Sequence, residues 1–403
     1  MYDILCLSST DWDEIWGSRQ QLMLRLAAAG HRVLFVERQV GPEHLARDPH
    51  LRQRKRRLWQ APALRCQQEN LWLWQPPLLP PGRYYSLTLN RLGQGRLAAR
   101  LRPVLQELGF AAPLLWLYPP HSAPLLGQLG ERLSIYHCIE RFTGGQAGRK
   151  RQVMLAQETD LLRRAGLVFT HAAGLQRLYA GLTRRPIVLV PSAADIAHYQ
   201  STTDVHPDIA ALPAPRLLVM GTLDARIDRD LLHAIAAARP DWQLVLVGHV
   251  RSERVDFSAL FRLPNVHHLG QRPFAELPAL LNGAQAGLLP YRRNELTEYI
   301  SPLKVYEYLA GGLPIASADL PEVRPLAGWV ALVPDHPGQP AAFARAFIAA
   351  IEHELRTDTP ARRAGRRQAA WQHSWDARLQ VMLAAITDAF ARALPGGPDE
   401  GPR

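Results

Sequence analysis

The sequence predicts an α/β protein with two Rossmann-like domains, each built on a doubly wound parallel sheet. Short apolar segments alternate with amphipathic segments in two separate series along the chain, as in such sheets. Residues 196–214 interrupt this alternation with several prolines and no hydrophobic period, which is typical of a linker. The 403 residues also exceed the ~250–300 that a single core normally holds, so two domains are expected.

The first series of elements predicts an N-terminal domain over residues 1–195. It opens with a strand at 2–9, a helix near 19–29 and a strand at 31–38. Residues 39–69 look irregular and basic, and the prolines within 76–82 exclude a helix interior or a central strand. The remaining expected elements are strands at 70–74, 114–120, 134–140, 166–172 and 186–192, and helices at 87–108 and 151–165.

The second series predicts a C-terminal domain over residues 215–374. Its expected elements are strands at 216–222, 242–248, 266–270, 286–290 and 314–318, and helices at 229–239, 274–282, 302–310 and 340–355. A final helix at 375–394 carries apolar residues at helical spacing, and we expect it to pack back on the N-terminal domain. Residues 395–403 are expected to be disordered. Ligands of such sheets bind at the carboxyl ends of the strands, so the two domains are expected to face a cleft.

Composition excludes several classes of protein. No apolar run approaches the ~20 residues of a membrane span, and the N-terminus lacks a basic leader segment. The three cysteines are far apart, which supports neither disulfides nor a zinc site and favours the cytoplasm. Residues 1–200 hold 26 Lys and Arg against 14 Asp and Glu, more than the whole formal charge of +11. An anionic partner of the first half is therefore expected.

The segment 299–317 carries the clearest chemistry. Ser301 is expected to cap a helix, with Pro302 at its first position. Lys304 is one of three lysines among 44 arginines, and it would add its charge to a helix N-terminus that already favours phosphate. Glu307 shares its face and could accept two hydroxyl groups. The alternative interpretation is an ordinary capped helix with a surface ion pair.

At this point the chain resembles the GT-B glycosyltransferases of the group 1 (family 4) type. Three blocks carry the resemblance in the family's order: RLLVMGTLDARIDRDLL with WQLVLVG, the segment from Asn265 to Tyr291, and SPLKVYEYLAGGLPI with LPEV. The resemblance implies a GT-B fold and transfer of a sugar from a UDP- or GDP-linked donor to a lipid-linked or polysaccharide acceptor. It implies no cofactor and no metal. The implied donor-binding residues are Gly221, Thr222, Arg226, Gly270, Gln271, Arg272, Tyr291, Ser301, Pro302, Leu303, Lys304 and Glu307.

One position departs from the family pattern. Retaining members carry a glutamate eight residues before the position of Glu307, where this chain has Tyr299. The departure resembles the inverting glucuronosyltransferases of xanthan-type polysaccharide assembly and leaves the stereochemistry open. It also leaves two alternatives: a sugar-nucleotide epimerase of the same fold, and an inactive, membrane-docked scaffold of polysaccharide export.

An inverting transfer needs a general base, which is expected in the N-terminal domain. Glu140 ends a predicted strand, and Asp13 lies in the loop after the first strand. These are the candidate bases, with Lys304 assisting the leaving phosphate. The same loop is expected to meet the acceptor through aromatic stacking. The candidate acceptor residues are Trp12, Trp16, Gly17 and His137. The DWD sequence at 11–13 is not expected to bind a metal.

The basic stretch 51–59 and its aromatic neighbours predict contact with an anionic membrane surface. The alternative is a solvated mobile loop. Nucleic acid would suit the same charge, but no recognisable nucleic-acid-binding module occurs, so none is expected as a partner. The predicted location is the cytoplasm, at the inner face of the plasma membrane.

Overall fold

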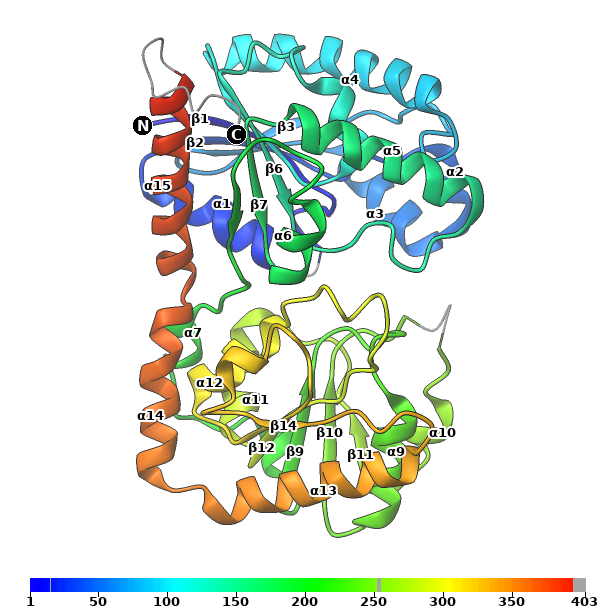
Figure 1. The fold of residues 1–403 in the computed structure, drawn as a ribbon, viewed down its shortest axis with the longest axis vertical. Coiled ribbons are helices and arrows are strands. Elements are labelled where there is room, and N and C mark those ends of the chain that lie inside the picture. The colour runs from blue at the N-terminus through cyan, green and yellow to red at the C-terminus, as the bar shows by residue number, and fades with distance from the viewer. Residues whose placement is uncertain (15, 252–254, 394–403) are drawn as a thin grey trace. The chain divides into compact units, whose positions relative to one another are not determined.

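The computed structural model describes residues 1–14, 16–251 and 255–393. The chain divides into two compact units (Figure 1). Unit 1 comprises Met1–Val190 and Leu379–Arg403, and unit 2 comprises Pro191–Arg378. The tail 395–403, predicted to be disordered, lies outside the described residues.

Unit 1 is built on an eight-stranded sheet with the order β3-β4-β2-β1-β5-β6-β7-β8. All pairs are parallel except that of the edge strand β3 with β4. The strands are β1 (Asp3–Leu7), β2 (Arg32–Val36), β3 (Leu64–Gln68), β4 (Leu71–Trp74), β5 (Leu114–Leu117), β6 (Leu133–Cys138), β7 (Leu167–Thr170) and β8 (Ile187–Leu189). The short apolar runs that predicted strands lie in this buried sheet, as expected for parallel strands covered on both faces.

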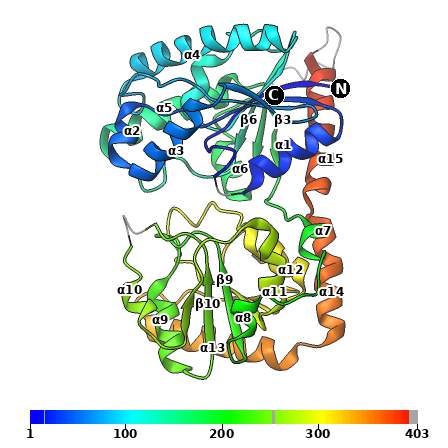
Figure 2. The same cartoon turned by 180° about the vertical axis from the view of Figure 1, so that it is seen from behind.

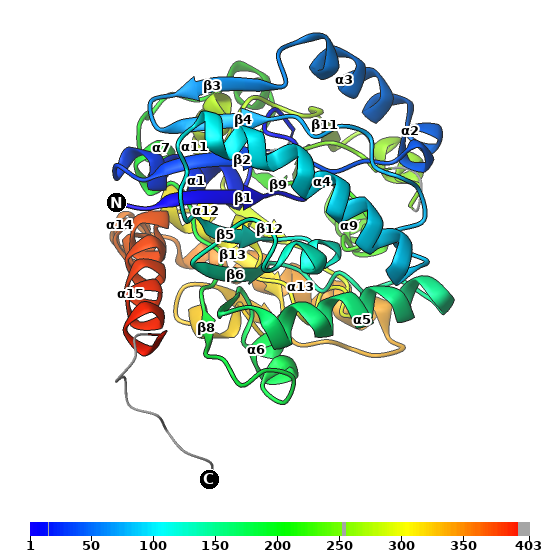
Figure 3. The same cartoon turned by 90° about the horizontal axis from the view of Figure 1, so that it is seen from above.

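The helices of unit 1 cover both faces of this sheet, as Figure 3 shows from above. They are α1 (Ser18–Ala28), α2 (Pro42–Arg47), α3 (Pro49–Gln60), α4 (Leu87–Glu107), the 3₁₀ helix η1 (Pro120–Leu125), α5 (Gly148–Arg164) and α6 (Ala173–Tyr179). The last helix, α15 (Trp375–Ala393), begins in unit 2 and continues into unit 1. Its Leu379, Met382 and Ile386 lie in the same core cluster as Ile4 and Phe35 of the central strands.

The prediction of an irregular segment at 39–69 is wrong, because this stretch contains α2, α3 and β3. Helix α3 begins at Pro49, and the side chain of Asp48 caps it by accepting a hydrogen bond from Leu51 N. Lys55, in the middle of the basic run, is fully buried with its Nζ 2.6 Å from Oδ1 of the buried Asp11. The basic stretch 51–59 is therefore a helix that one buried ion pair fixes to the loop after β1, and not an irregular loop.

Unit 2 holds a six-stranded, fully parallel sheet with the order β11-β10-β9-β12-β13-β14 (Figure 2). The strands are β9 (Arg216–Met220), β10 (Gln243–Val247), β11 (Val266–His268), β12 (Ala286–Leu289), β13 (Ile315–Ala318) and β14 (Ala331–Val333). The helices are α7 (Ile196–Tyr199), α8 (Pro207–Ala210), α9 (Arg229–Ala238), α10 (Ser258–Phe261), η2 (Phe274–Glu276), α11 (Leu277–Asn282), α12 (Leu303–Gly311), η3 (Arg324–Leu326), α13 (Pro340–Thr357), α14 (Pro360–Ala370) and η4 (Trp371–His373).

The predicted linker 196–214 is instead an integral part of unit 2. It forms α7 and α8, and its Ile196, Tyr199 and Ile209 are buried in one core cluster with β9 and α12. The prolines interrupt the hydrophobic periodicity of this segment, but its apolar residues still pack in the core. Short helices of four residues leave too little period to detect in the sequence.

Among the described residues, no helix is long and apolar enough to cross a bilayer. 

Candidate functional site

Strand order places one candidate site in unit 2. From β9 the chain proceeds outward to β10 and β11, whereas β12, on the other side of β9, leads to β13 and β14. The carboxyl ends of β9 and β12 therefore flank the point where the strand order reverses, which is where ligands of doubly wound sheets bind. Gly221 and Thr222 directly follow β9, and Tyr291 comes two residues after β12.

Helix α12 brings Lys304 and Glu307 to this point. The helix begins at Leu303 after the N-cap residue Pro302, and it ends at the left-handed Gly312. The Nζ atom of Lys304 lies 2.7 Å from Oε2 of Glu307, whose side chain is nearly fully buried. A Cβ atom placed on Gly221 would lie 3.5 Å from Cε of Lys304, so the lysine side chain passes directly over this glycine. The first turn of α12 and the loop after β9 thus form one site.

Ser301 does not cap α12 as the sequence predicted. Its Oγ accepts a hydrogen bond from Ser192 N at 3.0 Å, and its carbonyl oxygen accepts one from Ser192 Oγ at 2.8 Å. Among the described residues no side chain caps this helix. Val305 N donates to Pro302 O, so among the described residues the N–H groups of Leu303 and Lys304 are the ones that remain available to a ligand, at the positive end of the helix dipole.

A buried tyrosine fixes the height of α12 against the sheet. Met220 N donates a hydrogen bond to the hydroxyl of Tyr308 at 2.8 Å, and this hydroxyl donates to Leu218 O at 3.2 Å. A side chain on Gly287 of β12 would collide with the Tyr308 ring. Burial and the charge of Glu307 raise the pKa of the neighbouring Tyr199, so both tyrosines stay neutral around this carboxylate.

The loops after β9, β10 and β11 approach one another through glycine backbone. Gly221 N donates to Val247 O, and Gly248 N donates to Gly270 O at 2.8 Å. All three glycines have positive φ, at +123°, +153° and +71° in chain order. A Cβ on Gly248 would lie 1.9 Å from Gly221 O. Only glycine allows this approach, which leaves an edge of open backbone beside Lys304.

The two arginines predicted to touch the donor both have carboxylate partners. Arg226 holds Asp224 through Nε and Nη2, at 2.9 and 2.7 Å. Burial acts to raise the pKa of Asp224, but the hydrogen bonds and charge of Arg226 outweigh it and lower this pKa. Arg272 pairs with Asp208 of α8 and donates to Leu269 O, whereas the preceding Gln271 is exposed. Arg226 lies on the loop that continues from Gly221, while Arg272 fixes the base of the loop at Gly270.

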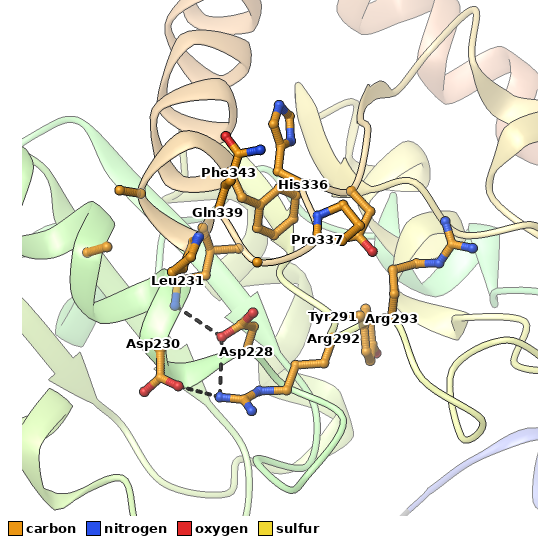
Figure 4. A pocket seen from close by; sticks show the side chains of 15 residues that line it. Asp228, Asp230, Leu231, Tyr291, Arg292, Arg293, His336, Pro337, Gln339 and Phe343 are labelled. Atoms are coloured by element: carbon orange, nitrogen blue, oxygen red, sulfur yellow. Dashed lines mark hydrogen bonds and ion pairs between the residues drawn. The ribbon is translucent and has the colours of Figure 1, made fainter.

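Tyr291 connects this site to a neighbouring cavity of about 530 Å³. It pairs with Ile227 across an antiparallel bridge and is partly buried between the two cores of unit 2. Figure 4 shows Asp228, Asp230 and Arg292 on one wall of the cavity, joined by ion pairs. Neither Lys304 nor Gly221 lines it. The N-terminus of α12 and the Lys304 ammonium therefore converge beside Gly221, outside this cavity.

The candidate bases of unit 1 lie on loops at the carboxyl ends of β1 and β6. The Asp13 side chain is well exposed, 3.3 Å from Arg65 Nη2. The Glu140 side chain is also exposed, with Oε1 3.8 Å from Arg19 Nη2. Both carboxylates can therefore reach a ligand from solvent.

The candidate acceptor residues differ in their access to solvent. Trp12 is buried in the core, with its ring 5.0 Å from Phe35, and so presents no open face to a sugar. His137 is buried as well and accepts a hydrogen bond from Trp116 Nε1, while burial sets its pKa well below the usual value. Trp16 is partly exposed and packs edge-on against Trp12. Gly17 caps α1, with its N–H donating to Gln20 Oε1.

Comparison with known proteins agrees with this geometry. Residues 214–353 match the family model described as glycosyl transferases group 1. This part of the chain is a group 1 glycosyltransferase domain. It covers the strands, the glycine loops and the helix that build the candidate site.

Matches to individual proteins extend beyond residues 214–353. A Bacillus subtilis (strain 168) protein named "Putative teichuronic acid biosynthesis glycosyltransferase TuaH" is 27% identical over 244 residues. That match covers 55% of this chain, which spans about 60% of the length of the relative. The fold is GT-B, with two Rossmann-like domains, as in two solved structures that match nearly the whole chain. These are sucrose-phosphate synthase from Thermosynechococcus elongatus, at a TM-score of 0.71, 19% identity and coverage of 97% and 100%, and HepE from Anabaena in complex with UDP-glucose, at 0.66, 15% identity and coverage of 96% and 100%.

Sequence reasoning missed Gly248 and Tyr308 of the group 1 domain. Gly248 is the last residue of the predicted strand WQLVLVG, and a glycine directly after a buried strand was the available signal. Tyr308 follows Glu307 in α12 and is buried, and its hydroxyl accepts a hydrogen bond from Met220 N at the end of β9. No sequence pattern predicts the hydrogen bond between the Tyr308 hydroxyl and Met220 N.

Proposed function

We propose that the protein is a glycosyltransferase that moves a sugar from a UDP- or GDP-linked donor to a lipid-linked or polysaccharide acceptor in cell-surface glycan assembly. The observation that carries the proposal is the meeting of Lys304, the uncapped first turn of α12 and Gly221 at the point of strand reversal. The names of the relatives support it, since one is assigned to teichuronic acid biosynthesis and another was solved with UDP-glucose.

In the proposed reaction the donor diphosphate lies against the first turn of α12. Backbone N–H groups and the Lys304 ammonium neutralise its charge, and this stabilisation grows as the bond from sugar C1 to the phosphate oxygen breaks. Glu307 accepts hydrogen bonds from the ribose hydroxyls. The Lys304 ammonium and the N–H groups of α12 supply the positive charge that a metal ion supplies in other transferases. We propose that no metal or cofactor is needed.

The acceptor hydroxyl attacks the sugar carbon while a carboxylate removes its proton. Glu140 and Asp13 remain the candidate bases, because both are exposed carboxylates at the strand ends of unit 1. The bond from the acceptor oxygen to C1 forms, the bond to the diphosphate breaks, and the proton goes to the carboxylate. This assignment belongs to an inverting reaction, in which a base is required.

Calorimetric titration with UDP, GDP and ADP tests the donor assignment. We expect UDP or GDP to bind in the micromolar range and ADP to bind at least about tenfold more weakly, a difference of about 1.4 kcal/mol. A panel of UDP- and GDP-sugars followed by mass spectrometry then identifies the donor through transfer or slow hydrolysis. If neither UDP nor GDP binds, the proposal is wrong; if a nucleotide binds but no donor is consumed, an inactive scaffold is the better description.

Peripheral binding to an anionic membrane is the second part of the proposal. Helix α3 supports it, since Arg52, Arg56 and Arg57 are exposed along it together with Trp59, while its one lysine is buried. Replacing these three arginines by glutamine is expected to reduce co-flotation with phosphatidylglycerol vesicles and to leave UDP binding unchanged. Equal flotation of the variant and the wild type would contradict a role of α3 in membrane binding.

A further inference from the structure

A buried arginine in unit 1 has no anionic partner within the part of the chain that the structure describes. Arg83 follows the proline-rich segment before α4 and is only 3% exposed. Its Nη2 atom donates to Gln39 O at 2.8 Å, but Nε and Nη1 are buried without a hydrogen-bond partner. Among the described residues no carboxylate lies within 4 Å of its guanidinium. A charge buried in this way is costly unless something compensates it.

Further buried polar groups with open hydrogen-bonding positions surround Arg83. Its carbonyl oxygen accepts from Gln157 Nε2 at 2.7 Å, and Gln94 Nε2 donates to Gln39 Oε1 at 2.7 Å. Several atoms of these neighbours are buried and lack a partner: Asn90 Oδ1, Gln94 Oε1, His121 Nε2 and Gln157 Oε1. Native proteins leave few such groups, and a cluster of them usually marks a bound water, ion or ligand.

The cluster is electropositive. Burial lowers the pKa of His44 to about 4 and holds that of His121 well below its usual value, and the charges of Arg83 and Arg38 act in the same direction at both imidazoles. The nearby Glu43 lies 3.2 Å from His44 Nδ1 and faces that imidazole. Both histidines are therefore neutral at pH 7, and Arg83 gives the cluster its positive charge.

Tyr84 lies between this cluster and solvent. The centroid of its ring is 5.1 Å from Arg83 Cζ and 5.4 Å from the His121 ring, and Lys150 Nζ lies 5.5 Å from the same centroid. Tyr84 and Lys150 are both partly exposed. The segment before α4 meets the first turn of α5 here, since Arg149 Nε donates to Tyr85 O.

Exposed apolar side chains adjoin this entrance. Tyr85 is 48% exposed, and Leu78, Leu87 and Leu89 are exposed to a similar degree. They lie on the segment before α4 and on its first turn, directly beside Arg83 in the chain. Isolated exposed leucines are common, but these four large apolar residues all lie within six positions of the buried Arg83 in the chain, so this segment is amphiphilic.

We propose that Arg83 and Lys150 bind a phosphate or diphosphate group of an amphiphilic acceptor, whose apolar chain contacts Leu78, Tyr85, Leu87 and Leu89. Phosphate suits the site because it offers several oxygens to the guanidinium, the ammonium and the imidazole at once, and Tyr84 would move aside to admit it. Only the word acceptor rests on the proposed transferase function. Binding of the anion itself follows from the open nitrogen atoms of Arg83.

The test separates this site from the donor site by working in a Lys304→Ala background. Inorganic pyrophosphate and farnesyl diphosphate are titrated by calorimetry at constant ionic strength. We expect farnesyl diphosphate to bind about tenfold or more tightly than pyrophosphate, since burying part of its chain gains about 25 cal/mol per Å². Adding Arg83→Gln should weaken both by about 10- to 100-fold, the value of a hydrogen bond to a charged group.

Two further variants keep the result interpretable. Arg91→Gln removes an equal charge from an exposed position of α4 and should leave both affinities unchanged. Lys150→Gln changes a partly exposed residue outside the buried cluster and should weaken pyrophosphate binding several-fold. The proposal is overturned if neither anion binds, or if Arg91→Gln weakens binding as much as Arg83→Gln. A third variant, Leu89→Ser, tests the contact with the apolar chain. The lipid part of the proposal is overturned if the protein binds pyrophosphate and farnesyl diphosphate equally well, or if Leu89→Ser changes the affinity for both to the same extent or for neither.

The outcome is distinguishable from that of the donor proposal. UDP titrated into Arg83→Gln with Lys304 intact should bind as in the wild type. If wild-type protein binds neither UDP nor GDP but pyrophosphate binding still depends on Arg83, the transferase proposal is wrong and the anion site stands. If UDP binds and pyrophosphate binding does not depend on Arg83, the anion site is wrong and the transferase proposal stands.

Discussion

Replacing Lys304 by methionine is expected to weaken UDP binding by about 10- to 100-fold, the range for losing one charge-assisted hydrogen bond. Methionine keeps most of the side-chain volume over Gly221, so the loss reports the ammonium and not the packing. The change also leaves Glu307 as a nearly buried carboxylate without its 2.7 Å partner, beside an incoming diphosphate. Repulsion between the two anions adds to the loss. Calorimetry with UDP measures the effect directly.

A double variant distinguishes the charge of Lys304 from the stability of its helix. Lys304→Met combined with Glu307→Gln removes both members of the pair, so the unpaired carboxylate disappears. We expect the double variant to recover part of its thermal stability relative to Lys304→Met, but not its affinity for UDP. Recovery of full affinity would show that the ammonium only neutralises Glu307, and wild-type binding by Lys304→Met would exclude it from the diphosphate site.

Replacing Gly248 by alanine is expected to destabilise unit 2 by about 3 kcal/mol or more, because the new methyl group forces backbone to move against packed neighbours. Its Cβ would lie 1.9 Å from Gly221 O, and a φ of +153° is one that L residues rarely adopt. Relieving either the close contact with Gly221 O or the unfavourable φ of residue 248 moves the backbone of Gly221. UDP binding should therefore fall even in protein that remains folded. Thermal denaturation with and without UDP measures the two effects together.

Gly328→Ala is the matched control in the same unit. A Cβ at Gly328 meets nothing within 4 Å, and this residue has no positive φ. We expect its melting temperature and its UDP affinity to equal those of the wild type. If Gly248→Ala behaves like Gly328→Ala, the close approach of the loops after β9 and β10 is not needed for the donor site.

Much of the candidate site could be predicted because its residues lie in contiguous, distinctive segments. Lys304 and Glu307 share one helical face by spacing alone, and Gly221 ends a clear apolar strand. The cap of α12 could not be predicted, since Ser301 has a competing partner 109 residues away in Ser192. The same holds for Arg272, whose partner Asp208 lies in a short helix that the sequence did not reveal.

Unit 1 was harder to predict because tertiary contacts stabilise elements with weak local patterns. Helix α3 has almost no apolar face, and its central Lys55 is buried only because Asp11 of a distant loop accepts its charge. Arg83 gave no signal at all, since being one of 44 arginines says nothing about burial. Pattern reasoning detects periodic burial and misses isolated buried charges.

The course of α15 has a consequence for how the protein can be divided. The first four residues of this helix belong to unit 2 and the rest belong to unit 1, where Leu379, Met382 and Ile386 complete the core beside β1. No single cut of the chain can therefore release two autonomous fragments. A proteolytic or recombinant fragment that ends near residue 190 would expose the apolar core residues that α15 covers in the full chain.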